Sequence, residues 1–409
     1  MSSGRDARGT ALVVVNADPW RLRRTHSTVG ALEADGWRVV VASPPAESLP
    51  SRFGHVRIGA MSESDLLRRL HGVFARNLMR LAITVLTLLP QSFRKPAIAG
   101  GAVRVLRLEG LVSALREEPP AVVIVHDPLL IAPVLHHRNG SRVVFDAREF
   151  FPRQFEHSFI WRTLIGSGMR RLMKQVLPEC DAVTTVSKGL RDGYRQLVNV
   201  DPVVVLNVPG YTPPAAERPQ PRTSDMRLRV VYHGGVNANR GLSDLIAALE
   251  PLDDMAELDL YLVGPRRLLR TLERRASRVA NVNVRAPVAF SEIHRMLTQY
   301  DAGLAFFRDR TFNLRHAMPS KFFEYLQAGL AVVVGPSPDM VGVVRRYDCG
   351  AVAESFAPSA LTAAVASFSA DRLREMQEHA LLAAESLCVE VEYDKMQELV
   401  EGLAGRAQG

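Results

Sequence analysis

Short runs of apolar, often β-branched residues alternate with longer stretches of helical spacing along almost the whole chain. Within a run, apolar and polar positions do not alternate, which is typical of parallel strands covered on both faces. The predicted strands span residues 11–17, 38–43, 55–59, 122–126, 142–147, 181–187 and 203–208, then 228–235, 258–264, 282–288, 302–308, 330–336 and 349–353. Strands separated by helices predict right-handed crossovers and doubly wound parallel sheets.

Helices are predicted between these strands and at the end of the chain. They lie near residues 22–35, 100–116, 159–177 and 188–198, then near 241–250, 266–280, 290–299, 320–328, 338–346 and 358–367, and finally near 371–388 and 391–404. The same α/β architecture therefore occurs twice, without a short sequence repeat.

Residues 209–226 interrupt the alternation because they are rich in proline and polar residues. We interpret them as a linker between two Rossmann-like domains, at 1–208 and 227–385, and expect a C-terminal helix at 386–409 to pack back toward the first domain. A chain of 409 residues suits two domains. Ligands bind at the carboxyl ends of the strands in such sheets, so we expect a cleft where the two domains face each other.

The formal net charge of +8 predicts an anionic partner. A nucleoside diphosphate and an anionic membrane surface fit this charge, whereas nucleic acid has no recognised motif in its favour and is not expected as a partner. The three cysteines are far apart and have no metal or disulfide spacing, which favours a reduced, cytoplasmic setting.

The strongest apolar segment is residues 81–90, which is too short to span a bilayer. Arg80, Arg94 and Lys95 flank it. We favour a buried helix here. The alternative is a helix that lies on a membrane surface or faces an acceptor.

The strongest chemical motif is residues 318–336, MPSKFFEYLQAGLAVVVGP. Ser320 begins a predicted helix, and Lys321 and Glu324 share one face of its first turn. A helix N-terminus favours phosphate, Lys321 adds a positive charge there, and Glu324 can accept hydrogen bonds from ribose hydroxyls. The alternative is an exposed Lys–Glu pair on a surface helix.

A second motif, YHGGVNANRGL at residues 232–242, follows the first strand of the second domain. Gly234 and Gly235 allow a close approach of the backbone to a ligand. Arg240 stands at the start of the next helix, where its guanidinium can hold a diphosphate. A tight turn between strand and helix is the alternative.

In the first domain, polar residues follow two predicted strands. His126 ends one strand and can hydrogen-bond a sugar hydroxyl or exchange a proton. Asp146, Arg148 and Glu149 follow the next strand, where either acceptor contact or a local ion-pair network is expected. The chain has no dinucleotide fingerprint, no Walker A sequence and no Asp-x-Asp pair, so we expect a metal-independent reaction without a cofactor.

Together these motifs resemble the retaining glycosyltransferases of the GT-B fold, specifically the family 4 group. The resemblance rests on Glu324 followed by Ala328-Gly329, on the glycine loop with a basic residue formed by Gly234, Gly235, Arg240 and Gly241, and on His126-Asp127-Pro128. It covers nearly all of both domains and is more specific in the second.

The resemblance implies a role for each matched position. Arg240 and Lys321 are expected to hold the donor diphosphate and stabilise the leaving group, with Ser320 beside them. Glu324 is expected to bind the ribose, and His126 the transferred sugar. The backbone after Tyr300-Asp301 and around Phe306 is expected to flank the base.

Three positions depart from the family pattern. His316 stands where the family often has a second glutamate, eight positions before Glu324, and becomes a possible sugar contact. Gly235 replaces an arginine of the phosphate loop. Residues 16–19, Asn-Ala-Asp-Pro, stand where the family has a glycine-rich loop.

The expected function is sugar transfer from a nucleoside-diphosphate sugar to an acceptor hydroxyl with retention of configuration. The acceptor can be a polysaccharide, a lipid-linked glycan or a small molecule, and the basic balance points to the inner face of the cell membrane. One alternative is a sugar-nucleotide 2-epimerase, which shares the fold but needs paired carboxylates. Another is a non-catalytic sugar-nucleotide-binding partner in a glycan assembly complex, which the histidine at 316 supports.

Overall fold

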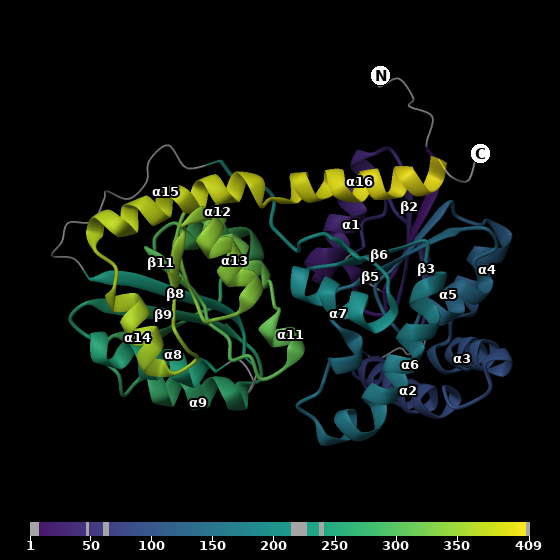
Figure 1. Ribbon diagram of the computed structural model, residues 1–409, viewed down its shortest axis with the longest axis horizontal. Coiled ribbons are helices and arrows are strands. Elements are labelled where there is room, and N and C mark those ends of the chain that lie inside the picture. Colours follow the sequence, from purple (N-terminus) through teal and green to yellow (C-terminus); the bar gives the residue numbers. More distant parts are fainter. Residues whose placement is uncertain (1–7, 46–48, 60–64, 214–226, 237–240, 406–409) are drawn as a thin grey trace. The chain divides into compact units, whose positions relative to one another are not determined.

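The computed structural model describes residues 8–45, 49–59, 65–213, 227–236 and 241–405 (Figure 1). The chain divides into two compact units. The first unit combines Met1–Val205 with Glu392–Gly409, and the second is Leu206–Val391. The sequence placed the end of the first domain at 208 and a linker at 209–226, whereas the structure groups residues 206–213 and 386–391 with the second unit.

The first unit contains a seven-stranded parallel sheet. Its strands are β1 (Thr10–Val14), β2 (Arg38–Ser43), β3 (Gly54–Arg57), β4 (Val122–Val125), β5 (Arg142–Ala147), β6 (Ala182–Thr185) and β7 (Val203–Val204). Their order in the sheet is β3-β2-β1-β4-β5-β6-β7. The inner strand β1 pairs with β2 and β4, which sets Leu12 opposite Val40 and Val123.

Helices cover the sheet of the first unit. They are α1 (Arg23–Ala34), α2 (Asp65–Leu86), α3 (Gln91–Leu106), α4 (Glu109–Glu117), α5 (Ile131–His137), α6 (Gly166–Val176), with a π-helical turn before it (Trp161–Ile165), and α7 (Lys188–Val198). The single helix predicted near 100–116 is two helices, because Arg107 takes a left-handed conformation (φ 52°) that ends α3.

The prediction of a buried helix at 81–90 holds for one face only, that of Ile83 and Thr84. Helix α2 ends at Leu86, and the side chains of Leu81, Val85, Leu88 and Leu89 are exposed. The buried face of α2 is instead formed by residues offset from these by about half a turn, among them Met79 and Ile83.

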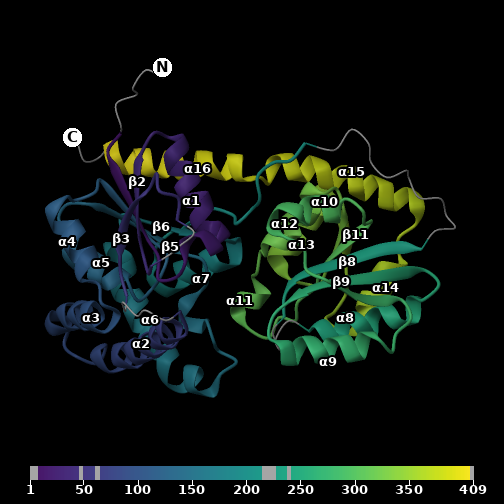
Figure 2. The ribbon, with the colours of Figure 1, turned by 180° about the vertical axis from the view of Figure 1, so that it is seen from behind.

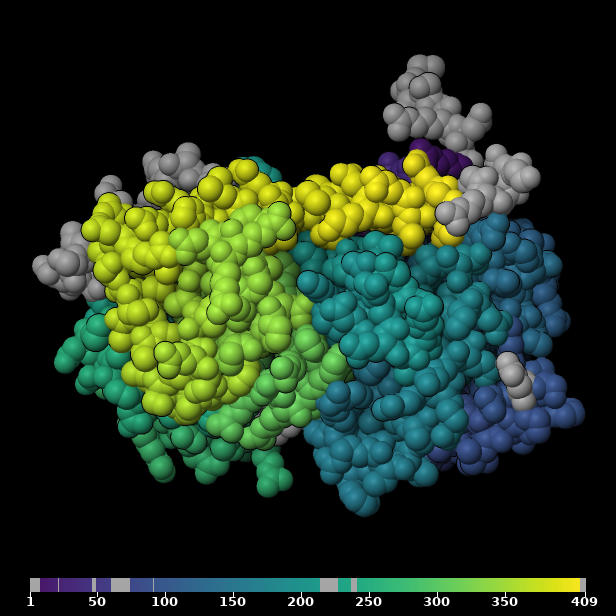
Figure 3. All heavy atoms as spheres, viewed as in Figure 1, coloured from purple at the N-terminus to yellow at the C-terminus, as the bar shows by residue number. Residues whose placement is uncertain are grey.

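Helix α16 (Val389–Gly405) packs on the first unit. Its buried residues Glu392, Met396, Val400 and Leu403 recur at helical spacing, and the apolar ones join the core beside α1 and β1. Gly30 of α1 permits the contact, because a Cβ there would overlap the hydroxyl of Tyr393. The yellow spheres of this helix form a ridge on the first unit in Figure 3.

The second unit contains a six-stranded parallel sheet, seen from behind in Figure 2. Its strands are β8 (Leu228–Gly235), β9 (Ala256–Val263), β10 (Val282–Arg285), β11 (Ala302–Ala305), β12 (Ala331–Val334) and β13 (Gly350–Val352), in the order β10-β9-β8-β11-β12-β13. Its helices are α8 (Leu242–Leu249), α9 (Arg266–Ala276), α10 (Ile293–Leu297), α11 (Phe312–Arg315), α12 (Ser320–Gln327), α13 (Pro338–Tyr347), α14 (Pro358–Ala366) and α15 (Ala370–Ser386). Every predicted strand has a counterpart in the two sheets, which confirms the α/β fold class.

Both sheets reverse their strand order beside the first strand of the unit, between β1 and β4 and between β8 and β11. In doubly wound sheets ligands bind at the carboxyl ends of the strands at this switch point. The topology therefore directs attention to the residues after β1 and β4 in the first unit, and after β8 and β11 in the second.

Candidate functional site

The switch point of the second unit brings the predicted residues Gly234 and Lys321 together, and α12, which carries Lys321, also carries Ser320 and Glu324. The Nζ of Lys321, on α12, lies 3.7 Å from the centre of the Tyr232 ring on β8 and 5.5 Å from that of Phe307, which follows β11. A Cβ on Gly234 would lie 2.8 Å from this Nζ, and the φ of Gly234 is +126°. Glycine is thus required at 234 both by its backbone conformation and by the space that the lysine occupies.

Glu324 lies one turn along the same helix and pairs with His233, a residue that sequence reasoning missed. The His233 Nε2 is 3.0 Å from the Glu324 Oε2, and both side chains are about 10% exposed. Because Glu324 and Lys321 are both buried, the alternative of an exposed Lys–Glu pair on a surface helix is wrong. The position of His233, directly before the two glycines at the end of β8, was the available signal.

Ser320 begins α12 and is held by a residue outside the motif. Its hydroxyl accepts a hydrogen bond from the Asn207 side-chain amide (3.1 Å) and lies 3.3 Å from the Asn207 carbonyl oxygen. The segment after the first unit therefore fixes the N-terminal turn of the helix that carries Lys321.

Arg240 lies outside the described residues, so its convergence with Lys321 remains a prediction. The chain resumes at Gly241, beside a pocket of about 250 Å³. Arg308 lines this pocket and makes a two-point ion pair with Asp244 (2.7 and 2.8 Å). Ser243 and Arg310 also line the pocket, which therefore combines polar and cationic groups beside Gly241.

His316 follows α11 and is tethered by an acid that the sequence did not single out. Its Nδ1 lies 2.7 Å from the Oδ2 of Asp339, in the first turn of α13. The imidazole also packs against the ring of Phe312, with 4.7 Å between ring centres. The sugar contact of His316 remains a prediction.

The expected surroundings of the base need a correction. Asp301 directly precedes β11, whereas Phe306 directly follows it. The hydroxyl of Tyr300 donates to Asp259, and an Asp301 oxygen accepts the backbone N–H of Arg229. Tyr300 and Asp301 thus lie at the amino end of the strand, and only Phe306 is at the end where Lys321 lies.

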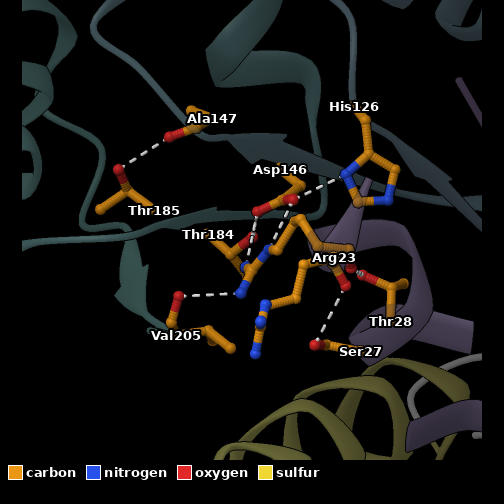
Figure 4. Close-up of polar contacts among 10 residues, drawn as sticks. Arg23, Ser27, Thr28, His126, Asp146, Ala147, Thr184, Thr185 and Val205 are labelled. Carbon is orange, nitrogen blue, oxygen red and sulfur yellow. Dashed lines mark hydrogen bonds and ion pairs between the residues drawn. The ribbon is translucent and has the colours of Figure 1, made fainter. Parts of the chain in front are cut away.

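In the first unit, Asp146 at the end of β5 is the centre of a buried network (Figure 4). Arg24 donates to both carboxylate oxygens (2.8 and 2.7 Å), and the Thr184 hydroxyl donates to Oδ1 (2.7 Å). The His126 Nδ1 lies 2.7 Å from Oδ2. For Asp146 the sequence left open either an acceptor contact or a local ion-pair network; the structure shows the network, in which both carboxylate oxygens have partners within the protein.

The network fixes the protonation of its members. Burial opposes ionisation of Asp146, but Arg24 and then His126 outweigh it and hold the pKa of Asp146 well below its ordinary value. Burial lowers the pKa of His126 despite the nearby carboxylate. A neutral imidazole must place its proton on Nδ1, facing the carboxylate, so its Nε2 is an acceptor. This buried Nε2 has no hydrogen-bond partner in the described part of the chain.

Further charged groups surround His126. Burial raises the pKa of Asp127 and of Glu149, and the nearby cations Arg148 and Arg80 partly offset the effect in both. The Oδ1 of Asp127 accepts the Leu129 backbone N–H (2.8 Å). The structure thus brings the predicted His126, Arg148 and Glu149 to one edge of the sheet.

Sequence reasoning missed the arginines from distant helices. Arg24 comes from α1, and Arg76 and Arg80 come from α2. Nothing in their local sequence marks them, because their partners are far away in the chain.

The described residues contain no group of three or more His, Cys, Asp or Glu side chains arranged to hold a metal ion. None of the helices in the described ranges is long and apolar enough to cross a membrane.

The Gly234→Ala variant is expected to lose donor-nucleotide affinity and about 1–3 kcal/mol of stability, because alanine is strained at this φ and its Cβ meets the Lys321 ammonium group. Gly342→Ala is the matched control, because Gly342 is exposed on α13 of the same unit and a Cβ there would meet nothing within 4 Å. Thermal unfolding and calorimetric titration with nucleoside diphosphates measure both effects. Equal behaviour of the two variants would contradict the close approach at 234.

Each of the two units matches a family model of known proteins. Residues 22–210 match the family model described as "Glycosyl transferase 4-like domain", and residues 227–371 match the model described as "Glycosyl transferases group 1". No curated protein sequence matches the chain significantly.

Solved glycosyltransferase structures share the fold. Sucrose-phosphate synthase from Thermosynechococcus elongatus is 12% identical, with a TM-score of 0.71 over 97% of this chain and 99% of its own. The UDP-forming α,α-trehalose-phosphate synthase from Burkholderia vietnamiensis is 13% identical, with a TM-score of 0.67 over 96% and 100%. An E. coli trehalose-6-phosphate structure bound with UDP-2-fluoro glucose is 13% identical, with a TM-score of 0.65 over 97% and 99%.

The two parallel sheets and these structural likenesses show the GT-B fold. The two family models together span most of the chain, and the protein belongs to the group 1 glycosyl transferases.

Proposed function

We propose that the enzyme transfers a sugar from a nucleoside-diphosphate sugar to an acceptor hydroxyl with retention of the anomeric configuration. One observation carries the proposal: the ammonium group of Lys321 lies against Gly234 and the Tyr232 ring, at the switch point where doubly wound sheets bind their ligands.

The main electrostatic problem of the reaction is the negative charge that develops on the departing diphosphate. Lys321 is 6% exposed, so its charge is little weakened by water, and the face of the Tyr232 ring helps to hold it in place. The N-terminus of α12 adds the positive end of the helix dipole, which also favours an anion. With Arg240, these groups would stabilise the leaving group without a metal or a further cofactor.

Other residues would orient the donor. We assign Glu324 to the ribose hydroxyls, with His233 fixing one of its carboxylate oxygens. Gly235 and Ser320 complete the donor loop. His126, neutral and held by Asp146, would accept a hydrogen bond from a hydroxyl of the transferred sugar at Nε2. Arg148, Glu149 and His316 are the further candidates for sugar or acceptor contact.

The acceptor is proposed to be a hydroxyl of a glycan, a lipid-linked glycan or a small molecule, within polysaccharide, glycolipid or other glycoconjugate synthesis. The setting is proposed to be cytoplasmic, at the inner face of the membrane. The charge and the cysteine content of the chain support this setting.

A donor screen tests the proposal. The protein is incubated with UDP-, GDP- and dTDP-sugars, and the released sugar is followed by proton NMR. We expect slow hydrolysis of one donor, with the first product in the anomeric form of the donor. Inversion at C2 would identify an epimerase instead, and binding without any turnover would identify a non-catalytic partner.

A further inference from the structure

Most of the large apolar side chains that the described chain leaves exposed gather in two segments of the first unit. One is α2 with the turn after it, and the other is the stretch 155–164. The exposed members are Phe74, Leu78, Leu81, Val85, Leu88, Leu89 and Phe93, together with Phe155, Phe159, Ile160 and Leu164.

On α2 the exposed apolar residues form a continuous stripe. Phe74, Leu78, Leu81 and Val85 are spaced four, three and four residues apart, which places them on one face of the helix. The opposite face, with Met79 and Ile83, is buried in the unit. The helix is therefore apolar on two faces, and the fold of its own unit uses one of them.

The second segment lies against α2. The Arg80 guanidinium of α2 stacks 5.3 Å from the Phe155 ring centre and 5.6 Å from that of Trp161. Phe159 is 70% exposed and Ile160 is 60% exposed. In Figures 1 and 2, α2, α3 and this stretch lie together at the end of the first unit farthest from α16.

Positive charge accompanies the apolar surface. A pocket of about 300 Å³ beside Trp161 is lined by Arg153, Arg162, Arg170 and Arg171, with Glu156 as its acidic member. Residues 66–108, which include most of α2 and all of α3, contain no aspartate or glutamate. Apolar side chains next to clustered arginines are what an interfacial protein presents to anionic lipid.

We propose that this end of the first unit, defined by the exposed side chains of 74–93 and 155–164 and the arginine pocket, docks on an anionic lipid bilayer. The apolar side chains enter the boundary between headgroups and acyl chains, and the arginines contact lipid phosphates. A second copy of the chain is a poorer occupant, because a symmetric contact would place one positive surface against its equal. The role of this docking rests on the proposed function, because docking would bring the enzyme to a lipid-linked acceptor.

Vesicle co-sedimentation of the full-length protein, without donor or acceptor, tests the docking. We expect binding to vesicles of phosphatidylcholine with phosphatidylglycerol, much weaker binding to phosphatidylcholine alone, and a decrease with added salt. Phe159→Glu and Val85→Glu should each weaken the binding at least about tenfold. Phe290→Glu is the matched control, because Phe290 is 69% exposed in the second unit and should leave the binding unchanged.

Charge is tested separately from apolar surface. Arg162→Ala with Arg170→Ala should weaken the preference for phosphatidylglycerol, whereas Arg267→Ala with Arg270→Ala, on the exposed arginine-rich helix α9, should not. Three results would overturn the proposal. The first is no binding of the protein to vesicles, and the second is the same loss of vesicle binding in both arginine double variants. The third is that Phe159→Glu abolishes association between copies of the protein but leaves lipid binding unchanged. Donor hydrolysis by the variants of the docking surface is measured in solution, without vesicles. Vesicle binding therefore tests the docking, and hydrolysis independently tests the proposed function.

Discussion

Lys321→Met is expected to lower donor turnover by about 10²- to 10³-fold, the range observed when one preorganised group that stabilises a developing anion is removed. Methionine has nearly the length of lysine and is apolar, so it can occupy the space between Tyr232, Gly234 and Phe307 without leaving a cavity. The fold should therefore persist while the charge is lost. Steady-state kinetics with the donor found in the screen measures the change.

The affinity for the free nucleoside diphosphate separates the two proposed roles of Lys321, which are binding of the diphosphate and stabilisation of the leaving group. If Lys321 contacts the diphosphate, calorimetric titration should show weaker binding of UDP, GDP or dTDP as well as slower turnover. Lys188→Met, a change of an exposed lysine on α7 of the first unit, provides the matched control. Unchanged affinity and unchanged turnover in Lys321→Met would remove the central residue of the proposed donor site.

The inner strands were predictable because most of them are short buried runs rich in β-branched residues, a pattern that depends on local sequence alone. For example, β8 occupies the predicted residues 228–235 and β2 the predicted residues 38–43. Helix α2 shows where the pattern misleads. An apolar stretch is expected to be buried, and the sequence does not reveal that the unit covers only one face of this helix.

The closeness of Lys321, Glu324 and Gly234 was predictable for a similar reason. Lys321 and Glu324 are neighbours on one helix, and Gly234 is the last residue but one of β8. The pairing of His233 with Glu324 joins residues far apart in the chain, as does that of Arg24 with Asp146. Such pairs depend on how strands and helices are placed side by side, which no local spacing encodes.

Asp146→Ala is expected to cost about 3–5 kcal/mol of stability, because it leaves the Arg24 guanidinium buried without its anion. Arg24 is 3% exposed and Asp146 is fully buried, so water cannot replace the lost partner. The same change removes the acceptor of the His126 Nδ1–H, so it should also lower turnover. The expected loss is a large share of the total stability of a typical domain.

The stability of the first unit can be measured separately from that of the second unit in the full-length protein. All three tryptophans, Trp20, Trp37 and Trp161, belong to this unit, so their fluorescence during urea unfolding reports its stability. The double variant Arg24→Met with Asp146→Leu replaces the ion pair by apolar side chains and should recover most of the loss. This double variant also keeps the test decisive if Asp146→Ala does not fold. Two results would contradict this prediction: a loss below about 1 kcal/mol in Asp146→Ala, or no recovery in the double variant. Either would show that burial of an unpaired Arg24 charge is not the cause of the lost stability.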